Sequence, residues 1–306
     1  MARYVLKRIL AAIAVLWAVV TVTFGATFLS PIDPGVAYAG LRATPAQIQA
    51  TRESLGLEDP LYVQYGRYMG RVIRGDLGES FFSGEPVRDS IAARLPRTAL
   101  LALAALIVQL AIGIPLGLLA ALRRGSGLDR GILFASLIGV AIPSFVLGFL
   151  FLYLLAFKLG AFPLGGSGSF NHLILPALTV GLAGAAWYAR MLRSTALNIL
   201  DEDYIRMARA KGLPERVVVL RHVLRNSIGP IITMIGLDLG ILLGGVLVIE
   251  QVYAWPGIGL QAWQAIERND IPMVMGTVLV AAFFVTAFNL LADLTNAAID
   301  PRVKYA

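Results

Sequence analysis

The chain has 306 residues, of which 58% are hydrophobic and only 15% are charged, a composition that indicates a protein of the lipid bilayer rather than a soluble domain. It contains no cysteine, which excludes thiol catalysis, disulfide bonds and cysteine-ligated metal sites. The net charge of +7 is compatible with nucleic-acid binding, but the basic residues flank apolar segments and no base-stacking aromatic stripe accompanies them.

Six apolar segments are candidates for membrane-spanning helices, each of which needs about 20 residues to cross the hydrocarbon core. Their expected bounds are roughly 9–29, 98–122, 131–157, 173–189, 228–249 and 272–292. Pro115 and Pro143 fall inside two of these segments and can kink them. We therefore expect an all-α, polytopic membrane protein whose residues 1–306 form one transmembrane domain with six spans.

Lysine and arginine residues predict how the chain is oriented. If the N-terminus is cytoplasmic, 16 of the 26 basic residues lie on the cytoplasmic side. The long outer segment carries eight of the others together with eight acidic residues, and long segments count least in the positive-inside rule. We therefore expect both termini to be cytoplasmic, residues 31–97 to be extracytoplasmic and residues 190–227 to form a cytoplasmic loop.

Two short helices are expected in the extracytoplasmic segment. Thr44, Pro45 and Gln47 form a plausible capping box that opens a helix, and Gly56 closes it. A second helix begins at Asp59-Pro60. Its apolar residues recur at helical spacing and include three tyrosines, which suits a helix that lies at the membrane interface.

The cytoplasmic loop is expected to contain a charged helical hairpin. Asp201 can cap a helix with acidic residues in its first turn and basic residues in its last turn, and Gly212 can end it. Pro214 suits the start of a second helix. The spacing of three and four gathers one set of residues on a single face of the first helix: Tyr204, Met207, Ala208 and Lys211.

The small residues of this hairpin suggest a docking surface. Ala208 and Gly212 carry no side chain that would hold a partner away from the backbone. The alternative is an amphipathic hairpin that packs only on its own protein.

No catalytic or metal-binding site is expected. His172 and His222 are the only histidines and fall on opposite sides of the expected membrane. A nucleotide-binding P-loop needs Gly-Lys followed by Ser or Thr, and none of the four lysines follows a glycine. Any ATP hydrolysis that drives this protein must therefore take place on another polypeptide.

Asp238 lies near the middle of the fifth expected span, where a carboxylate is costly. We expect it to face a translocation pathway or a partner subunit; protonation or a hydrogen bond to a neighbouring helix is the alternative. Small residues recur around the same span at Gly236, Gly240, Gly244 and Gly245. Such a face allows close helix packing, either between subunits or within one chain.

Two motifs of the loop carry a family resemblance: residues 208–212 read ARAKG and residues 222–226 read HVLRN. They resemble the "EAA" cytoplasmic loop of ABC importer permeases, and more closely its dipeptide and oligopeptide branch. The general pattern opens with Glu-Ala-Ala, whereas residues 206–208 here are Arg-Met-Ala, which favours the peptide branch. The resemblance continues from Tyr4 to the end through Arg74-Gly75-Asp76-Leu77-Gly78, Trp255-Pro256-Gly257-Ile258-Gly259 and Asp300-Pro301-Arg302.

The resemblance implies a type I ABC importer (MetI-like) permease fold in the inner membrane of a bacterium or archaeon. It implies that the chain forms half of a translocation pathway, binds no cofactor and is not itself an enzyme. The expected partners are a second homologous permease, an extracytoplasmic substrate-binding protein and two cytoplasmic ATPase subunits that use ATP and Mg. Residues expected to couple to the ATPase are Tyr204, Met207, Ala208, Arg209, Lys211, Gly212 and Leu213.

The resemblance favours di- or oligopeptides as substrates, while relatives of the same architecture carry nickel complexes, glutathione or other small solutes. It also places the region after the fifth span at an external gate, although the residues alone favour a structural re-entrant or interfacial loop. Residues 31–97 either receive the binding protein or pack at the interface. Two readings of other classes remain: an ion-coupled secondary transporter that uses Asp238, and a membrane scaffold that recruits a soluble partner through the loop.

Overall fold

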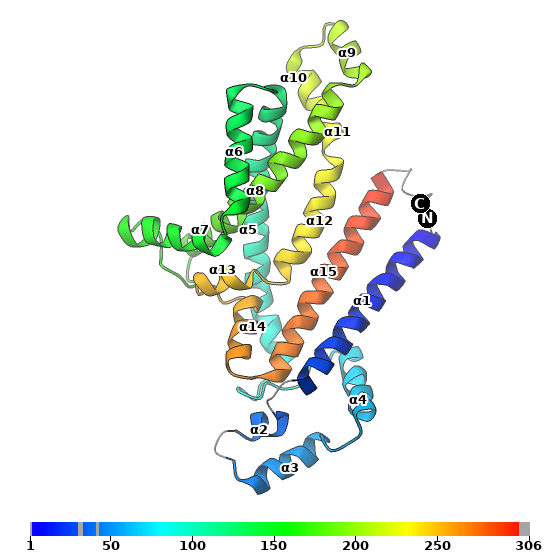
Figure 1. Ribbon diagram of the computed structural model, residues 1–306, viewed down its shortest axis with the longest axis vertical. Coiled ribbons are helices and arrows are strands. Elements are labelled where there is room, and N and C mark those ends of the chain that lie inside the picture. Colours follow the sequence, from blue (N-terminus) through cyan, green and yellow to red (C-terminus); the bar gives the residue numbers. More distant parts are fainter. Residues whose placement is uncertain (1, 30–32, 41–42, 300–306) are drawn as a thin grey trace.

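Long apolar helices dominate the computed structural model, which describes residues 2–29, 33–40 and 43–299 (Figure 1). Four helices are long and apolar enough to cross a bilayer: α1 (Ala2–Leu29), α5 (Val87–Leu122), α8 (Asn171–Leu200) and α15 (Ile271–Ile299). Two bent helix pairs bring the number to six if each pair is one span. The prediction of an all-α membrane fold is confirmed, and the count of six depends on these pairs.

The first bent pair occupies the expected span 131–157, and the kink expected at Pro143 is a sharp bend. Helix α6 (Gly127–Ala141) is followed by α7 (Ser144–Phe151) and a π-helix, η1 (Leu152–Lys158). The chain turns by 97° between α6 and the segment Ser144–Lys158 that α7 and η1 form together. The turn falls at Pro143, which cannot continue the hydrogen bonds of α6 and forces an extended backbone at the residue before it. As a result α7 and η1 project sideways from the bundle (Figure 1). Pro115, in contrast, lies inside the uninterrupted helix α5.

The second bent pair replaces the expected fifth span. Residues 215–227 comprise α10 (Glu215–Val217), the π-helix η2 (Val218–Leu224) and α11 (Arg225–Ser227), and they meet α12 (Gly229–Leu243) at 49°. Helix α12 ends before the expected residue 249. Gly245 has φ = +104°, which breaks the helix, and a separate short helix, α13 (Leu247–Val252), follows.

Small residues let the spans pack closely inside the chain. A Cβ atom on Gly113 or Gly117 of α5 would lie within 3 Å of the α8 backbone. In α12, Gly236 lies against Ala292 of α15 and Gly240 against Val285 of the same helix. Of the two alternatives for the glycines of α12, packing within one chain is therefore the one that the structure supports.

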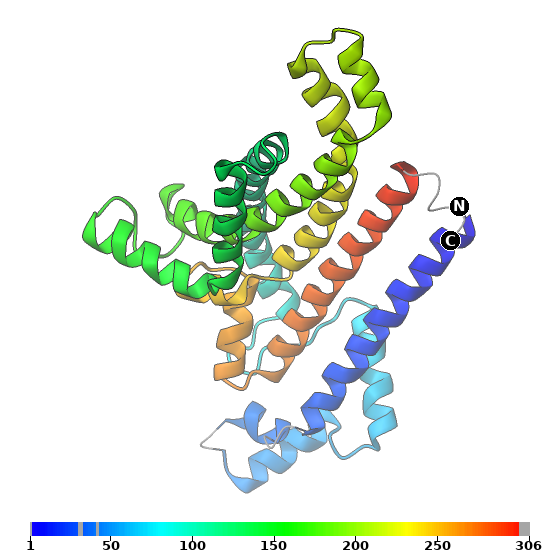
Figure 2. The same ribbon diagram turned by 45° about the horizontal axis from the view of Figure 1, so that its top comes forward.

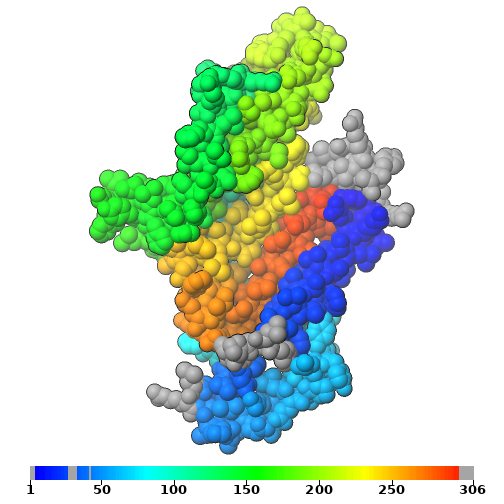
Figure 3. All heavy atoms as spheres, in the orientation of Figure 1, coloured from blue at the N-terminus to red at the C-terminus, as the bar shows by residue number. Residues whose placement is uncertain are grey.

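The segment after α1 forms a lobe across one end of the bundle (Figure 3). It contains α2 (Pro34–Ala39), α3 (Pro45–Leu55) and α4 (Leu61–Ile73). The expected capping box of α3 is confirmed, because Thr44 and Gln47 exchange hydrogen bonds and Gly56 ends the helix in the left-handed conformation. Helix α4 packs on α1, where the hydroxyl groups of Tyr65 and Thr21 lie 2.8 Å apart.

The hairpin that follows α8 lies at the opposite end of the bundle from this lobe (Figure 1). The beginning of α1 and the end of α15 lie toward the hairpin, and Arg8 of α1 pairs with Asp293 of α15 at 2.8 Å. We call these the hairpin end and the lobe end of the molecule. The C-terminal motif Asp300-Pro301-Arg302 and residues 31–32 and 41–42 of the expected outer segment lie outside the described residues.

Candidate functional site

The charged loop forms a helical hairpin that extends beyond the bundle (Figures 1 and 2). Helix α8 continues to Leu200, and α9 (Asp203–Ala210) begins after a short turn. The expected cap of α9 was wrong: Asp201 follows the end of α8, and its carboxylate lies 3.3 Å from Arg124. Glu202 occupies the N-cap position without a side-chain capping bond, because the turn places it, rather than Asp201, beside the first turn of α9.

The inner side of the hairpin forms a small apolar core. Ile205 and Ala208 of α9 are buried against Val218 and Val223 of η2, and this core continues onto Ala196 of α8. Ala208 therefore contacts its own chain. The expectation that a partner approaches the backbone at Ala208 is corrected, since that position faces the interior of the hairpin.

An ion pair closes the turn of the hairpin. The guanidinium of Arg209 donates two hydrogen bonds to the carboxylate of Glu215, at 3.1 and 2.7 Å. Gly212 lies between them with φ = +77°, a conformation that favours glycine. Arg209 was expected to supply polar contacts to a partner, but its charge is already satisfied within the hairpin.

Other residues of the hairpin remain available on its outer surface. Met207 is 58% exposed, and an ideal Cβ on Gly212 would meet no atom within 4 Å. We define the hairpin face by the exposed residues that the sequence singled out, without the internally paired Arg209: Tyr204, Met207, Lys211, Gly212 and Leu213. An exposed apolar surface beside a basic residue is typical of a site that binds another protein.

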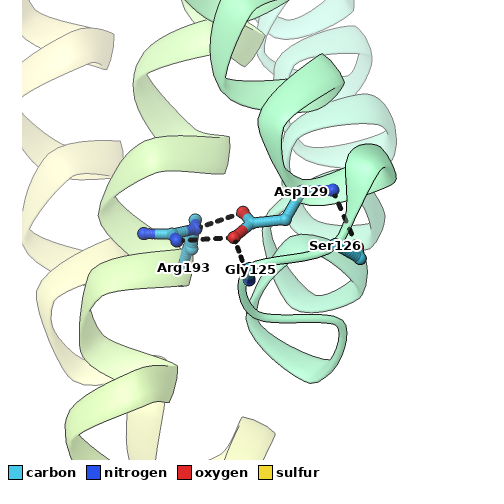
Figure 4. A network of polar contacts seen from close by, with 4 residues as sticks. All are labelled: Gly125, Ser126, Asp129 and Arg193. Atoms are coloured by element: carbon cyan, nitrogen blue, oxygen red, sulfur yellow. Dashed lines mark hydrogen bonds and ion pairs between the residues drawn. The ribbon is translucent and has the colours of Figure 1, made fainter.

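A buried ion pair ties the base of the hairpin to α6 (Figure 4). The carboxylate of Asp129, only 2% exposed, accepts hydrogen bonds from Nε and Nη2 of Arg193 at 2.6 and 2.8 Å and from the amide of Gly125 at 2.9 Å. Ser126 caps α6 by accepting from the Asp129 amide. Bidentate pairing of this kind fixes geometry as well as charge, so α6 and α8 are held together at this point.

Sequence reasoning missed this pair and treated Arg193 only as one of the basic residues that set the orientation. Its partner lies 64 positions away, and no local pattern links the two. The spacing of Ser126 and Asp129 at the start of α6 was the one available signal, because it is typical of a helix N-terminus.

A second buried carboxylate organises the turn between α13 and α14 (Ile258–Glu267). Glu250 is fully buried, and it accepts hydrogen bonds from the hydroxyl of Thr98 in α5 and from the amide of Leu260, each at 2.9 Å. A Cβ on Gly257 would lie 2.2 Å from this carboxylate. The turn therefore requires glycine at position 257, and it is attached to α5 at Thr98, within the first third of that helix.

Aromatic residues attach the same turn to other helices. The hydroxyl of Tyr253 lies 2.8 Å from that of Thr179 in α8 and donates to the carbonyl of Gly148 in α7. The indole of Trp255 donates to the carbonyl of Arg97. These contacts attach the segment to three helices of its own chain, whereas a position at an external gate stays a prediction. The role of Glu250 was not foreseen.

Asp238 of α12 is partly buried and lies beside Tyr188 of α8. The Tyr188 hydroxyl is buried, and the Asp238 carboxylate is the polar group of α12 that lies beside it. Contact with a neighbouring helix was one of the two expectations for this aspartate. A position on the translocation pathway stays a prediction.

Comparison with known proteins agrees with this architecture. Residues 113–305 match the family of binding-protein-dependent transport system inner membrane components, and residues 1–102 match its N-terminal family. The oligopeptide transport system permease protein AppB of Bacillus subtilis is 39% identical over the full length of both chains. The glutathione transport system permease protein GsiC of Escherichia coli K12 is 38% identical, again over both full lengths.

A solved structure shows the same fold. The MetNI methionine ABC transporter in an inward-facing conformation aligns with a TM-score of 0.57 and 20% identity, over 69% of this chain and 96% of its own. This likeness confirms the expected type I importer fold. With the two family matches and the full-length relatives, it identifies the chain as a member of the binding-protein-dependent transport system inner membrane component family, the permease subunits of ABC importers.

Proposed function

We propose that this permease imports small peptides and receives the force of ATP hydrolysis through its hairpin face. The hairpin then lies in the cytoplasm together with both termini. Its partners are two ATPase subunits that use ATP and Mg, a second homologous permease and an extracytoplasmic substrate-binding protein. The relatives named for oligopeptide and glutathione transport support a peptide substrate, since glutathione is itself a small peptide.

The coupling role is supported by two features of the hairpin: its exposed apolar face, and its firm attachment to α8 and α6. Met207 and Tyr204 are exposed at the end of a hairpin that has its own core. That core is continuous with α8, a single helix of 30 residues, and Arg193 of α8 is held by Asp129 of α6. A push on the hairpin face would therefore move α8 and α6 together rather than deform the loop.

Substitution of Met207 by Asp tests this coupling. A charge at the centre of a protein interface typically costs about 2 kcal/mol, or roughly 30-fold in affinity. We expect the variant to lose its ATPase when the importer is purified in mild detergent, and to lose peptide uptake in a strain that lacks the native permease. Gly212 is a poorer choice, because its left-handed φ would strain any other residue. A loss of ATPase binding could then come from a misfolded hairpin rather than from a blocked interface.

Two controls accompany this experiment. Met207→Leu keeps the apolar surface and is expected to behave like the wild type. Tyr62→Asp places the same charge on an exposed aromatic position of α4 at the lobe end, far from the hairpin. Retention of ATPase and uptake by Met207→Asp would contradict the coupling role of the hairpin face.

The substrate class has its own test. Uptake of a labelled dipeptide, an oligopeptide, glutathione and nickel is compared in the deletion strain with and without this permease and its companion subunits. Peptide uptake that depends on the permease supports the proposal. Uptake of nickel alone would assign the chain to another branch of the family.

A further inference from the structure

A cavity of about 430 Å³ lies between the lobe and the ends of two spans. Its volume falls in the range of ligand-binding pockets. Residues of α1, α15 and α4 line it, together with residues of α2 and α3. It is separate from the hairpin face and from the Glu250 turn, so neither of those features accounts for it.

One side of the cavity is apolar and belongs to the membrane-spanning helices. Phe24 comes from the lobe end of α1, and Ile271 and Met275 come from the first turns of α15. Helix α1 buries little of its surface within the chain and exposes large apolar side chains such as Trp17 and Val22. This side of the cavity is therefore next to a helix that faces lipid.

The other side of the cavity is charged and belongs to the lobe. Arg71 of α4 and Glu79 of the following loop both line it, and neither forms an ion pair within the described part of the chain. Arg67 also lines the cavity, but its charge is matched by Asp59. Asp76 lines the cavity as well, and it has no ion pair among the described residues, although its carboxylate accepts a hydrogen bond from the Gly78 amide. The cavity thus offers one unpaired cation and two carboxylates without an ion pair on the side away from the spans.

Tyr68 supplies a third polar group in the cavity wall. The residue is only 9% exposed, and its hydroxyl has no hydrogen-bond partner among the described residues. Burial raises the pKa of this hydroxyl to about 12, so it remains protonated and can donate a hydrogen bond. The positive charge of Arg71 acts in the opposite direction and lowers the pKa of the same hydroxyl, but burial is the larger effect. Buried polar groups without a partner are uncommon in native proteins, and an acceptor bound between these two residues would satisfy both.

We propose that this cavity binds a phospholipid whose headgroup carries both a phosphate and an ammonium group. The phosphate would bind Arg71 and Tyr68, and the ammonium group would bind Glu79. An acyl chain would pack on the apolar side formed by Phe24 and Met275. A free peptide has the same zwitterionic chemistry. The lipid is favoured because the apolar side of the cavity is built from the ends of spans, at the depth where a headgroup meets its acyl chains.

Lipid binding to the purified importer complex tests the proposal. The complex is stripped of lipid in detergent and titrated with phosphatidylethanolamine, phosphatidylglycerol or a dipeptide, and binding is followed by native mass spectrometry and thermal unfolding. We expect phosphatidylethanolamine to bind and to raise the Tm. Arg71→Gln and the shape-conserving Tyr68→Phe should each weaken this binding about tenfold, as expected for loss of a hydrogen bond to a charged group.

Arg74→Gln is the matched control, because Arg74 follows the same helix, is exposed and does not line the cavity. It should bind phosphatidylethanolamine like the wild type. Equal binding by the wild type and both cavity variants would overturn the proposal. Preferential protection by the dipeptide would overturn the assignment to lipid, and equal binding of phosphatidylglycerol would overturn the zwitterionic headgroup. Protection by the dipeptide counts against the lipid only if Arg71→Gln abolishes it, because a peptide importer can also bind the dipeptide along its translocation pathway.

Discussion

Removing Arg193 from the buried pair at the base of the hairpin should destabilise the permease substantially. In Arg193→Met, the carboxylate of Asp129 stays buried and keeps only the hydrogen bond from the Gly125 amide. Breaking a buried pair by removing one partner typically costs 3–5 kcal/mol, because an uncompensated charge remains. The Arg193 side chain is itself 21% exposed, so water can reach the site, and we expect the lower end, about 3 kcal/mol.

Thermal unfolding of the purified protein measures this loss. The chain has no cysteine for thiol-reactive dyes, but its four tryptophans allow unfolding to be followed by intrinsic fluorescence. A cost of about 3 kcal/mol corresponds to a decrease in Tm of roughly 6–12 °C. Arg190→Met, on the same helix, removes only a contact with the ring of Trp187 and should change the Tm much less.

The double variant Asp129→Asn/Arg193→Met separates a lost attraction from an uncompensated charge. If the unpaired carboxylate is the main cost, neutralising it should restore part of the stability that Arg193→Met loses. A double variant as unstable as the sum of the two single variants would refute this reasoning. So would a Tm of Arg193→Met within about 1 °C of the wild type, since 1 kcal/mol already shifts Tm by roughly 2–4 °C.

Three further predictions follow from the packing and the orientation of the chain. Gly236→Ala should lower the free energy of unfolding by about 1–3 kcal/mol, because the new Cβ would lie 2.5 Å from that of Ala292. Gly229→Ala in the same helix is the control, since its Cβ would meet no atom within 4 Å. Equal Tm values for the two variants would contradict the packing. Glu250→Gln should lower the free energy of unfolding by about 1–3 kcal/mol, because the carboxylate now accepts from both the Thr98 hydroxyl and the Leu260 amide, and the NH₂ of glutamine would face one of these donors. An unchanged Tm would count against the role of Glu250 in holding the turn. A fluorescent protein fused to the C-terminus should fluoresce if that end is cytoplasmic, and a dark, correctly inserted fusion would reverse the orientation.

Much of the architecture could be predicted from local sequence. Apolar segments of sufficient length identified the membrane class, since a helix in lipid must satisfy its own backbone hydrogen bonds. The capping box at Thr44 and the end of α3 at Gly56 were also read correctly, because caps depend on residues a few positions apart. The motifs of residues 208–212 and 222–226 pointed to the family that the full-length relatives confirm.

The composition and the spacing of residues therefore determined that the chain is a helical membrane protein and where its helices roughly lie, and the loop motifs indicated the permease family through their resemblance to it. Only the tertiary structure decided which polar groups meet. Ala208 faces a core made with η2, Arg209 is paired with Glu215, and Asp129 and Glu250 bind residues of distant helices. Local pattern can report how a helix begins, ends and exposes a face, but it cannot report which helix lies opposite. That depends on close packing across the whole bundle, where a single bend such as that at Pro143 changes which side chains come into contact.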